Sequence, residues 1–149
     1  MIREALLADA SALCQINRDE MGYNVSVEFT KEQLALLLKD QNHHLIAVFE
    51  DDMNHQVLGY VHAELYRELY AADVLNVWGL AVATDQQGKG IGKSLMQWLE
   101  EEALSRNIHA IRLNSGANRL GAHRFYQKLG FEEVKLQKSL LKSYKFLCQ

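Results

Sequence analysis

A glycine-rich turn, set between an apolar run and an amphipathic run, constrains the fold of this sequence more than any other feature. Apolar residues dominate positions 74–83, Gly88, Gly90 and Gly92 follow, and an apolar stripe at helical spacing occupies positions 91–103. The first N–H groups of a helix have no intrahelical partner and lie at the positive end of the helix dipole, so glycines here let a phosphate approach the main chain. The pattern predicts a strand, an anion-binding loop and a helix in succession.

Two widespread phosphate loops do not fit these glycines. The ATP-binding P-loop requires a glycine five residues before the Gly-Lys-Ser triplet at 92–94, where this sequence has Gln87. The dinucleotide-binding fingerprint requires glycines at its first, third and sixth positions, and Lys93 occupies the sixth when the count starts at Gly88. A tight glycine turn that holds no ligand remains the alternative to a third kind of phosphate loop.

The composition is that of an ordinary globular chain. Apolar residues make up 48% and charged residues 23% of the 149 residues, and we expect one domain over residues 1–149. No apolar run approaches the ~20 residues of a membrane span, and the acidic start does not resemble a signal peptide, so we expect a cytoplasmic protein without a membrane partner. A net charge of -3 argues against electrostatic binding of nucleic acid.

Cysteine and histidine usage predicts neither a disulfide nor a metal site. Cys14 and Cys148 lie far apart in the sequence, and we interpret both as free thiols. The six histidines show none of the usual ligand spacings, so no metal ligands are assigned.

Hydrophobic periodicity and turn residues predict an alternation of strands and helices along the whole chain. The first half is expected to contain a strand at 1–6, a helix capped by Asp9 or Ser11, a second helix opened by Thr30, a hairpin of strands 44–50 and 57–66, and a central strand at 74–83. The second half is expected to contain a helix at 90–106, a strand at 108–113, a helix at 119–129, a strand restarting at Phe131 and a final strand at 138–147.

Gly79 stands in the middle of the central strand and has two interpretations. An interior glycine often marks a β-bulge, which would free the backbone of Leu80, Ala81 and Val82 to bond an extended, amide-bearing ligand. The alternative is a glycine that makes room for the packing of a tryptophan.

Tyr126 lies on the apolar stripe of the last predicted helix. Ala122, Phe125, Tyr126 and Leu129 follow helical spacing, and Gly130 stands where a left-handed residue ends a helix. From periodicity alone Tyr126 is a core residue.

Two motifs together resemble the GNAT superfamily of acetyl-CoA-dependent N-acetyltransferases. The first is Gln87-x-x-Gly90-x-Gly92 directly after a strand, and the second is the run Phe-Tyr-Gln-Lys-Leu-Gly-Phe at 125–131. The order of predicted elements is similar to the GNAT fold over essentially the whole chain. The resemblance implies an α/β (mixed α+β) fold, in which helices flank a central, mostly antiparallel mixed sheet with a bulged central strand.

The resemblance also implies roles for individual residues. Loop amides would hold the pyrophosphate of acetyl-CoA, the bulged strand would hold pantetheine and the thioester carbonyl, and Tyr126 would protonate the departing thiolate. The cofactor-binding residues expected on this basis are Leu80, Ala81, Val82, Gln87, Gly88, Lys89, Gly90, Ile91, Gly92, Lys93 and Asn118.

One position departs from the family pattern. Many members carry a glutamate two residues before the position of Leu80, where it activates the amine, and this sequence has Trp78 there. The general base is therefore open. Glu64, which shares a strand face with His62, is the best single candidate for a base or a cation anchor, although a solvated sheet face is the plainer interpretation of both.

The expected activity is direct transfer of an acetyl group from acetyl-CoA to a primary amine within a ternary complex, which needs no protein nucleophile. The expected acceptor is a cationic small molecule or peptide amine, attracted by acidic residues that include Glu28, Glu68 and Asp73. A homodimer is compatible with the sequence. Three different activities stay open: transfer of a longer acyl chain, transfer to a protein amine, and acyl-CoA binding without catalysis.

Overall fold

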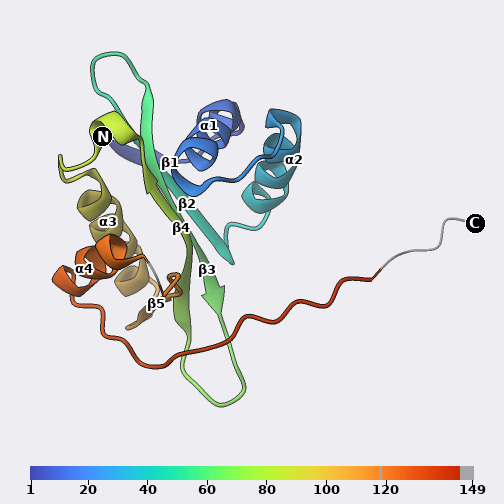
Figure 1. Ribbon diagram of the computed structural model, residues 1–149, viewed down its shortest axis with the longest axis vertical. Helices are drawn as coiled ribbons and strands as arrows, with labels where there is room; N and C mark the ends of the chain where they lie inside the picture. The colour runs from blue at the N-terminus through green and yellow to red at the C-terminus, as the bar shows by residue number, and fades with distance from the viewer. Residues whose placement is uncertain (118, 145–149) are drawn as a thin grey trace, which may run out of the picture. The chain divides into compact units, whose positions relative to one another are not determined.

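A five-stranded sheet forms the centre of the computed structural model, which describes residues 1–117 and 119–144 (Figure 1). The strands lie in chain order and are β1 (Ile2–Glu4), β2 (His44–Glu50), β3 (Val57–Tyr66), β4 (Val74–Val82) and β5 (Ile111–Leu113). Neighbouring strands are antiparallel except for β4 and β5, which are parallel. This is the mixed, mostly antiparallel sheet that the sequence predicts.

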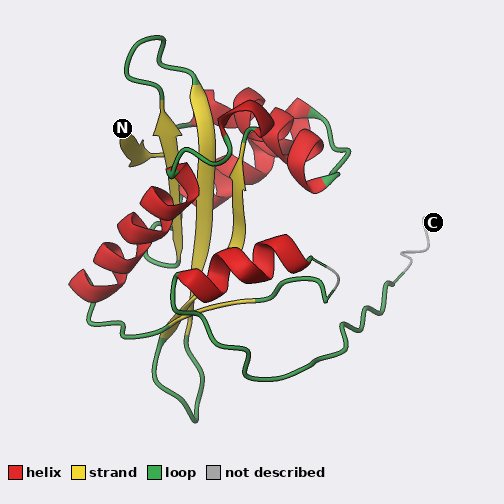
Figure 2. Ribbon diagram, turned by 60° about the vertical axis from the view of Figure 1, so that its left-hand side comes forward, coloured by secondary structure: helices red, strands yellow, loops and turns green. Residues whose placement is uncertain are grey.

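Helices cover both faces of the sheet. The helices are α1 (Ala10–Met21), α2 (Val27–Leu38), α3 (Ile91–Ser105) and α4 (Leu120–Lys128), with short 3-10 turns η1 (Leu7–Asp9) and η2 (Thr84–Gln86). Figure 1 shows α1 and α2 on one face and α3 on the other, and Figure 2 shows the same layers from the side. The chain divides into two compact units at residues 114 and 115, and α4 belongs to the second unit.

The core of the first unit has two halves, one on each face of the sheet. On the α1 and α2 side, Leu13 and Leu34 pack with Val48 and Tyr60 in a cluster of buried residues. The α3 side chains Leu95 and Leu99 are completely buried. Strand residues alternate between the two faces, and both are covered, which explains why β2 and β3 are apolar through most of their length.

The start of α2 differs from the prediction. Ser26, not Thr30, is the N-cap residue, and its Oγ accepts a hydrogen bond of 3.0 Å from the Phe29 N–H. The Thr30 hydroxyl instead donates to the Ser26 carbonyl, a bond from a residue already inside the helix. Serine and threonine both favour the N-cap position, and here the helix begins at the earlier of the two, Ser26.

The predicted strands after α4 are absent from the described residues. No strand occurs over residues 131–144, and residues 145–147 of the predicted final strand lie outside the described part. Val134, Leu136, Leu140 and Leu141 are each at least 85% exposed. Alternation of apolar residues predicts a strand, but a strand forms only when another strand supplies hydrogen bonds.

The strand predicted at 108–113 is shorter than expected. Ile108 is buried and donates its N–H to the Ala103 carbonyl at the end of α3, so pairing with β4 begins only at Ile111. No helix among the described residues is long and apolar enough to cross a bilayer.

Candidate active site

A β-bulge interrupts β4 at Trp78. His62 of β3 is paired with Gly79 and Ala63 with Val77, so Trp78 is an extra residue without a partner in β3. Its side chain is 53% exposed, whereas its neighbours Val77 and Gly79 are buried. The bulge expected from Gly79 is therefore present.

Gly79 also makes room for a neighbouring side chain. A Cβ atom at this position would lie 2.7 Å from the hydroxyl oxygen of Tyr60. That hydroxyl donates a hydrogen bond to Oδ1 of Asn17 in α1, and burial raises the pKa of Tyr60 to about 12. The two interpretations of Gly79 hold together, but the side chain packed against it is a tyrosine and not a tryptophan.

Beyond the bulge, β4 has an open edge. β5 pairs with β4 only as far as Val77 among the described residues. The Ala83 N–H donates to Leu58 of β3 at 2.8 Å, and because backbone groups alternate in direction along a strand, Leu80 and Val82 direct theirs away from β3. Such an edge can bond an extended, amide-bearing ligand as an added strand would.

The glycine loop has the backbone that the sequence implies. Gly88 and Gly90 adopt φ values of +80° and +83°, which other residues rarely adopt, and Gly90 is the N-cap of α3. The first bond of the helix runs from the Ser94 N–H to the Gly90 carbonyl. The N–H groups of residues 91–93 therefore lie outside the helical ladder, where an anion could accept hydrogen bonds from them.

The loop is held in place by an acidic residue that the sequence analysis did not single out. Glu20, near the end of α1, accepts hydrogen bonds from the Thr84 hydroxyl and, at 2.8 Å, from the side-chain amide of Gln87. The same Gln87 amide nitrogen lies 3.0 Å from the Val82 carbonyl. The Gln87 side chain, at the surface, thus ties the loop to α1 and to the end of β4.

A polar network lies on the sheet face covered by α1 and α2. The Trp78 indole N–H donates to Oε1 of Glu64 at 2.9 Å, and Oε2 of Glu64 lies 3.5 Å from Nε2 of His44. The other ring nitrogen of His44, Nδ1, is 3.0 Å from Nε2 of His62. The predicted pair of His62 and Glu64 is thus joined through His44, which belongs to β2.

Burial sets the charge state of the inner end of this network. Burial, together with the charge of nearby His44, lowers the pKa of His62 to about 4, against a smaller opposing effect of Glu64. His62 is therefore neutral at neutral pH, and one of its ring nitrogens is a hydrogen-bond acceptor. The side chains of His44 and Glu64 are 17% and 29% exposed, so the outer end of the network meets solvent.

The other acidic residues predicted near the acceptor are placed differently. Asp73 accepts hydrogen bonds from Arg67, the shortest at 2.8 Å, and this partner lowers the pKa of the Asp73 carboxyl. Glu28 and Glu68 are exposed. Because Arg67 neutralises Asp73, Glu64 is the strongest candidate for an acceptor-side carboxylate near the bulge.

The second unit contains Tyr126, on α4. Its half-buried ring packs edge to face against Phe125 and Phe131, with centroid separations of 5.3 and 5.6 Å. Burial raises the pKa of Tyr126, and the positive charge of Arg119 opposes that shift. The hydroxyl is therefore protonated at neutral pH. Asn118, the other residue assigned to this region, lies outside the described residues.

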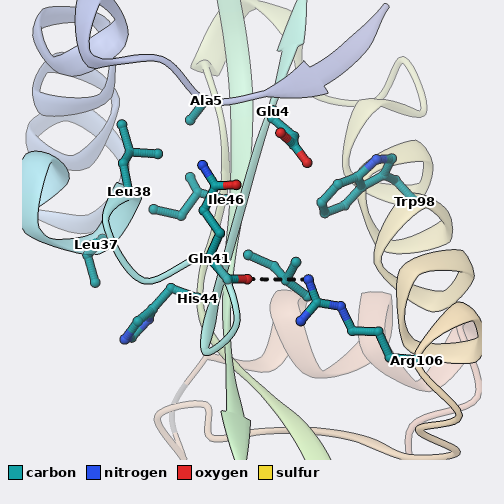
Figure 3. Close-up of a pocket in the computed structure, with 10 residues that line it drawn as sticks. Glu4, Ala5, Leu37, Leu38, Gln41, His44, Ile46, Trp98 and Arg106 are labelled. Atoms are coloured by element: carbon teal, nitrogen blue, oxygen red, sulfur yellow. Dashed lines mark hydrogen bonds between the residues drawn. The ribbon is translucent and has the colours of Figure 1, made fainter.

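A small pocket lies at the edge of the sheet where β1 ends (Figure 3). Glu4, Trp98 and Arg106 line one side, and Arg106 donates to the Gln41 carbonyl at 3.3 Å. His44 forms part of the wall, and its ring lies on the α2 side of the strands, away from Trp98 and Arg106. Among the described residues, no group of three histidine, cysteine, aspartate or glutamate side chains could hold a metal ion.

Comparison with known proteins decides the family. The model of the acetyltransferase (GNAT) family matches residues 10–131, most of the chain. The chain belongs to the GNAT acetyltransferase family. It is therefore an acetyl-transferring enzyme by family, and GNAT enzymes generally use acetyl-CoA as the acetyl donor.

Individual relatives agree with this assignment. An aminoalkylphosphonate N-acetyltransferase from Salmonella typhimurium is 27% identical over 122 residues, which cover 81% of this chain and 75% of that protein. An aminoglycoside 6'-N-acetyltransferase from Acinetobacter haemolyticus has a similar fold, with a TM-score of 0.82 at 17% identity, over 97% of this chain and 99% of that one. Glucosamine-6-phosphate N-acetyltransferase from Arabidopsis thaliana has a TM-score of 0.80 at 16% identity, over 96% and 98% of the two chains. The GNAT fold predicted from the sequence is confirmed.

Proposed function

We propose that this GNAT enzyme transfers the acetyl group of acetyl-CoA directly to a primary amine, with both substrates bound at once. The observation that carries this proposal is the pairing of a bulged, open-edged β4 with a glycine loop at the start of α3. An extended ligand with amides at one end and a pyrophosphate at the other matches these two features. Acetyl-CoA supplies an activated acetyl thioester when it is bound.

The residues assigned to the donor have distinct tasks. The outward backbone groups of Leu80 and Val82, with Ala81 between them, bond pantetheine and orient the thioester carbonyl. The N–H groups of residues 88–93 face the pyrophosphate, with Gln87 and Glu20 holding the loop. Lys89 and Lys93 add positive charge beside that anion, and Asn118 completes the assigned set.

Two proton transfers accompany the reaction. The amine nitrogen forms a bond to the thioester carbon, the carbon–sulfur bond breaks, and the proton lost by the amine must leave the site. Glu64 accepts that proton, and Glu64 and the adjacent His44 are both partly exposed, so the proton has a path to solvent. The Tyr126 hydroxyl donates a proton to the departing thiolate sulfur.

The absence of a protein nucleophile from these assignments favours direct attack. Cys14, the free cysteine of the described residues, is buried. Holding the donor and the amine side by side gives a large rate advantage without a covalent enzyme intermediate.

An acetyl-transfer screen tests the proposal. The purified chain is mixed with acetyl-CoA and with amino acids, polyamines, aminoglycosides, aminoalkylphosphonates or peptides, and free thiol and N-acetylated product are measured. We expect thiol release that depends on one class of amine and equals the product formed. Tight acetyl-CoA binding without turnover on any amine would instead indicate a non-catalytic acyl-CoA-binding module. Turnover only with a longer acyl donor would indicate a long-chain acyltransferase, and turnover only on protein amines would indicate a protein acetyltransferase.

A further inference from the structure

Arg112 of β5 is a partly buried cation without an anionic partner in the first unit. Its side chain is half-buried, yet it forms no hydrogen bond or ion pair with the other residues of that unit, Met1–Asn114. Arg3, the other half-buried arginine, bonds both Asp9 and Glu50. Partial burial of a guanidinium without an anion has a free-energy cost, so an unpaired one is well suited to a charged ligand.

Arg112 lies on the sheet face that carries the polar network. The register pairs Arg112 with Asn76 of β4, and Asn76 with Glu64 of β3, so the three residues share one face. The guanidinium carbon of Arg112 lies 5.2 Å from the centroid of the Tyr66 ring, and Tyr66 packs edge to face against Trp78 at 6.2 Å. A cation and the Glu64 carboxylate are thus separated by two aromatic side chains.

Asn76 adds a second unsatisfied group between these charges. It is 2% exposed, and its Oδ1 atom is buried without a hydrogen-bond partner among the described residues. A buried acceptor left unpaired has a free-energy cost, and such an atom in a native protein calls for an explanation, such as a bound water or ion. The register places this buried polar group between Glu64 and Arg112.

We infer that the acceptor is a zwitterion: a primary amine that also carries an anionic group such as a phosphonate, phosphate or carboxylate. This inference rests on the proposed acetyl transfer and specifies its acceptor. The ammonium end lies by Glu64, Asn76 and the aromatic ring of Trp78, and the anionic end accepts hydrogen bonds from the Arg112 guanidinium. A planar guanidinium donates two parallel hydrogen bonds to an oxyanion, which fixes the orientation of a small acceptor.

The charge on Arg112 also disfavours the acceptor expected from the sequence. A polyamine bound at Glu64 would place its second ammonium on the same face as the guanidinium, and like charges in a partly desolvated site repel. Arg67 already neutralises Asp73, so the face around the bulge is not an acidic groove. A zwitterion satisfies both charges.

The test compares matched amines and matched variants by kcat/KM for acetyl transfer. The amines are 2-aminoethylphosphonate, β-alanine, propylamine and 1,3-diaminopropane, which differ mainly in the terminal group. We expect the better of the two zwitterions to exceed propylamine by roughly tenfold or more, and the diamine to be the poorest. In Arg112→Gln the ratio of zwitterion to propylamine falls toward one, and Arg112→Lys gives an intermediate ratio because it keeps charge without the planar fork. The control Arg106→Gln removes one exposed charge at the end of α3 and keeps the parent ratio.

Several outcomes separate this inference from the proposed function. Equal use of propylamine and both zwitterions, a preference for the diamine, or an unchanged ratio in both Arg112 variants would overturn the zwitterion. The difference between phosphonate and β-alanine shows which oxyanion Arg112 prefers. If no amine in the panel or the broader screen releases thiol, the acetyl-transfer proposal itself fails. The preference for a zwitterion over propylamine and the diamine is measured on the parent enzyme alone. The inference therefore stays testable even if an Arg112 variant does not fold.

Discussion

The indole nitrogen of Trp78 lies 2.9 Å from Oε1 of Glu64 and donates a hydrogen bond to it. Trp78 occupies the β4 position at which many GNAT members carry a glutamate, and its hydrogen bond holds the Glu64 carboxylate beside that position. Glu64 reaches the same face from β3, and Trp78 and His44 orient its two oxygens. In the mechanism that we propose, the neighbouring strand supplies the carboxylate that acts as base.

Replacing Glu64 with glutamine should slow acetyl transfer, because it removes the carboxylate that accepts the proton of the amine in the proposed mechanism. At the pH optimum of the parent, kcat of the variant should be about 10²-fold lower. Steady-state kinetics from pH 6 to 9 measure this. Glu28→Gln, at an exposed site in the first turn of α2, is the control and should retain the parent profile. A raised KM with unchanged kcat would reduce Glu64 to a cation anchor.

The buried histidine makes stability depend on pH. The folded state lowers the pKa of His62 from 6.5 to about 4, so between these values the unfolded chain binds a proton that the folded protein resists. Stability is then lost as the pH falls from 6.5 toward 4, by at most about 3–4 kcal/mol. Urea unfolding at several pH values should show that His62→Asn escapes this loss. His109→Asn, at an exposed histidine, should behave as the parent.

A bulky residue in the glycine loop should weaken acetyl-CoA binding. Gly90 has a φ of +83°, and a β-branched side chain there would both strain the backbone and stand at the N–H groups that face the pyrophosphate. Gly22→Val is a matched control, because Gly22 has a φ of +72° at the end of α1 and equally open surroundings. Calorimetry should show a large loss of affinity only in Gly90→Val. Equal affinity in the two folded variants would contradict the assignment of the loop.

Removal of the Tyr126 hydroxyl should slow turnover without releasing the donor. Tyr126→Phe keeps the ring that packs against Phe125 and Phe131 and removes only the proton donor. We expect kcat to fall roughly 10²-fold, the contribution of one positioned general acid, with acetyl-CoA affinity nearly unchanged. Phe125→Leu tests the structural role, since it should lower thermal stability more than Tyr126→Phe does. Equal turnover by Tyr126→Phe and the parent would leave Tyr126 as a packing residue.

Local patterns predicted most of the fold. β2 and β3 begin and end at the predicted residues because alternation and a polar turn bound them on both sides, and the glycine loop fixes the start of α3. The start of α2 was wrong because Ser26 and Thr30 are both good caps. The strands expected at 131–144 were not found, since alternation says nothing about whether a partner strand is available.

The candidate site was predictable only in part. The loop, the bulge and Glu64 lie in short sequence motifs that can be recognised without knowing the tertiary structure. His44, Glu20 and Arg112 were missed because each acts through a partner at least 18 residues away in the sequence, and only the strand register or helix packing brings the partners together. A register counted from the turn, where Glu50 pairs with Val57, would place residue 63 and not residue 64 opposite His44, because the register shifts by one residue between Phe49 and Glu50.

Initial-velocity kinetics test direct acetyl transfer in a ternary complex most directly. Rates of thiol release are measured while acetyl-CoA and the best amine of the screen are varied against each other, and the protein is analysed by mass spectrometry after exposure to acetyl-CoA alone. We expect intersecting reciprocal plots and no acetylated protein. Parallel plots together with one acetyl group on the protein would show a covalent intermediate and contradict direct transfer.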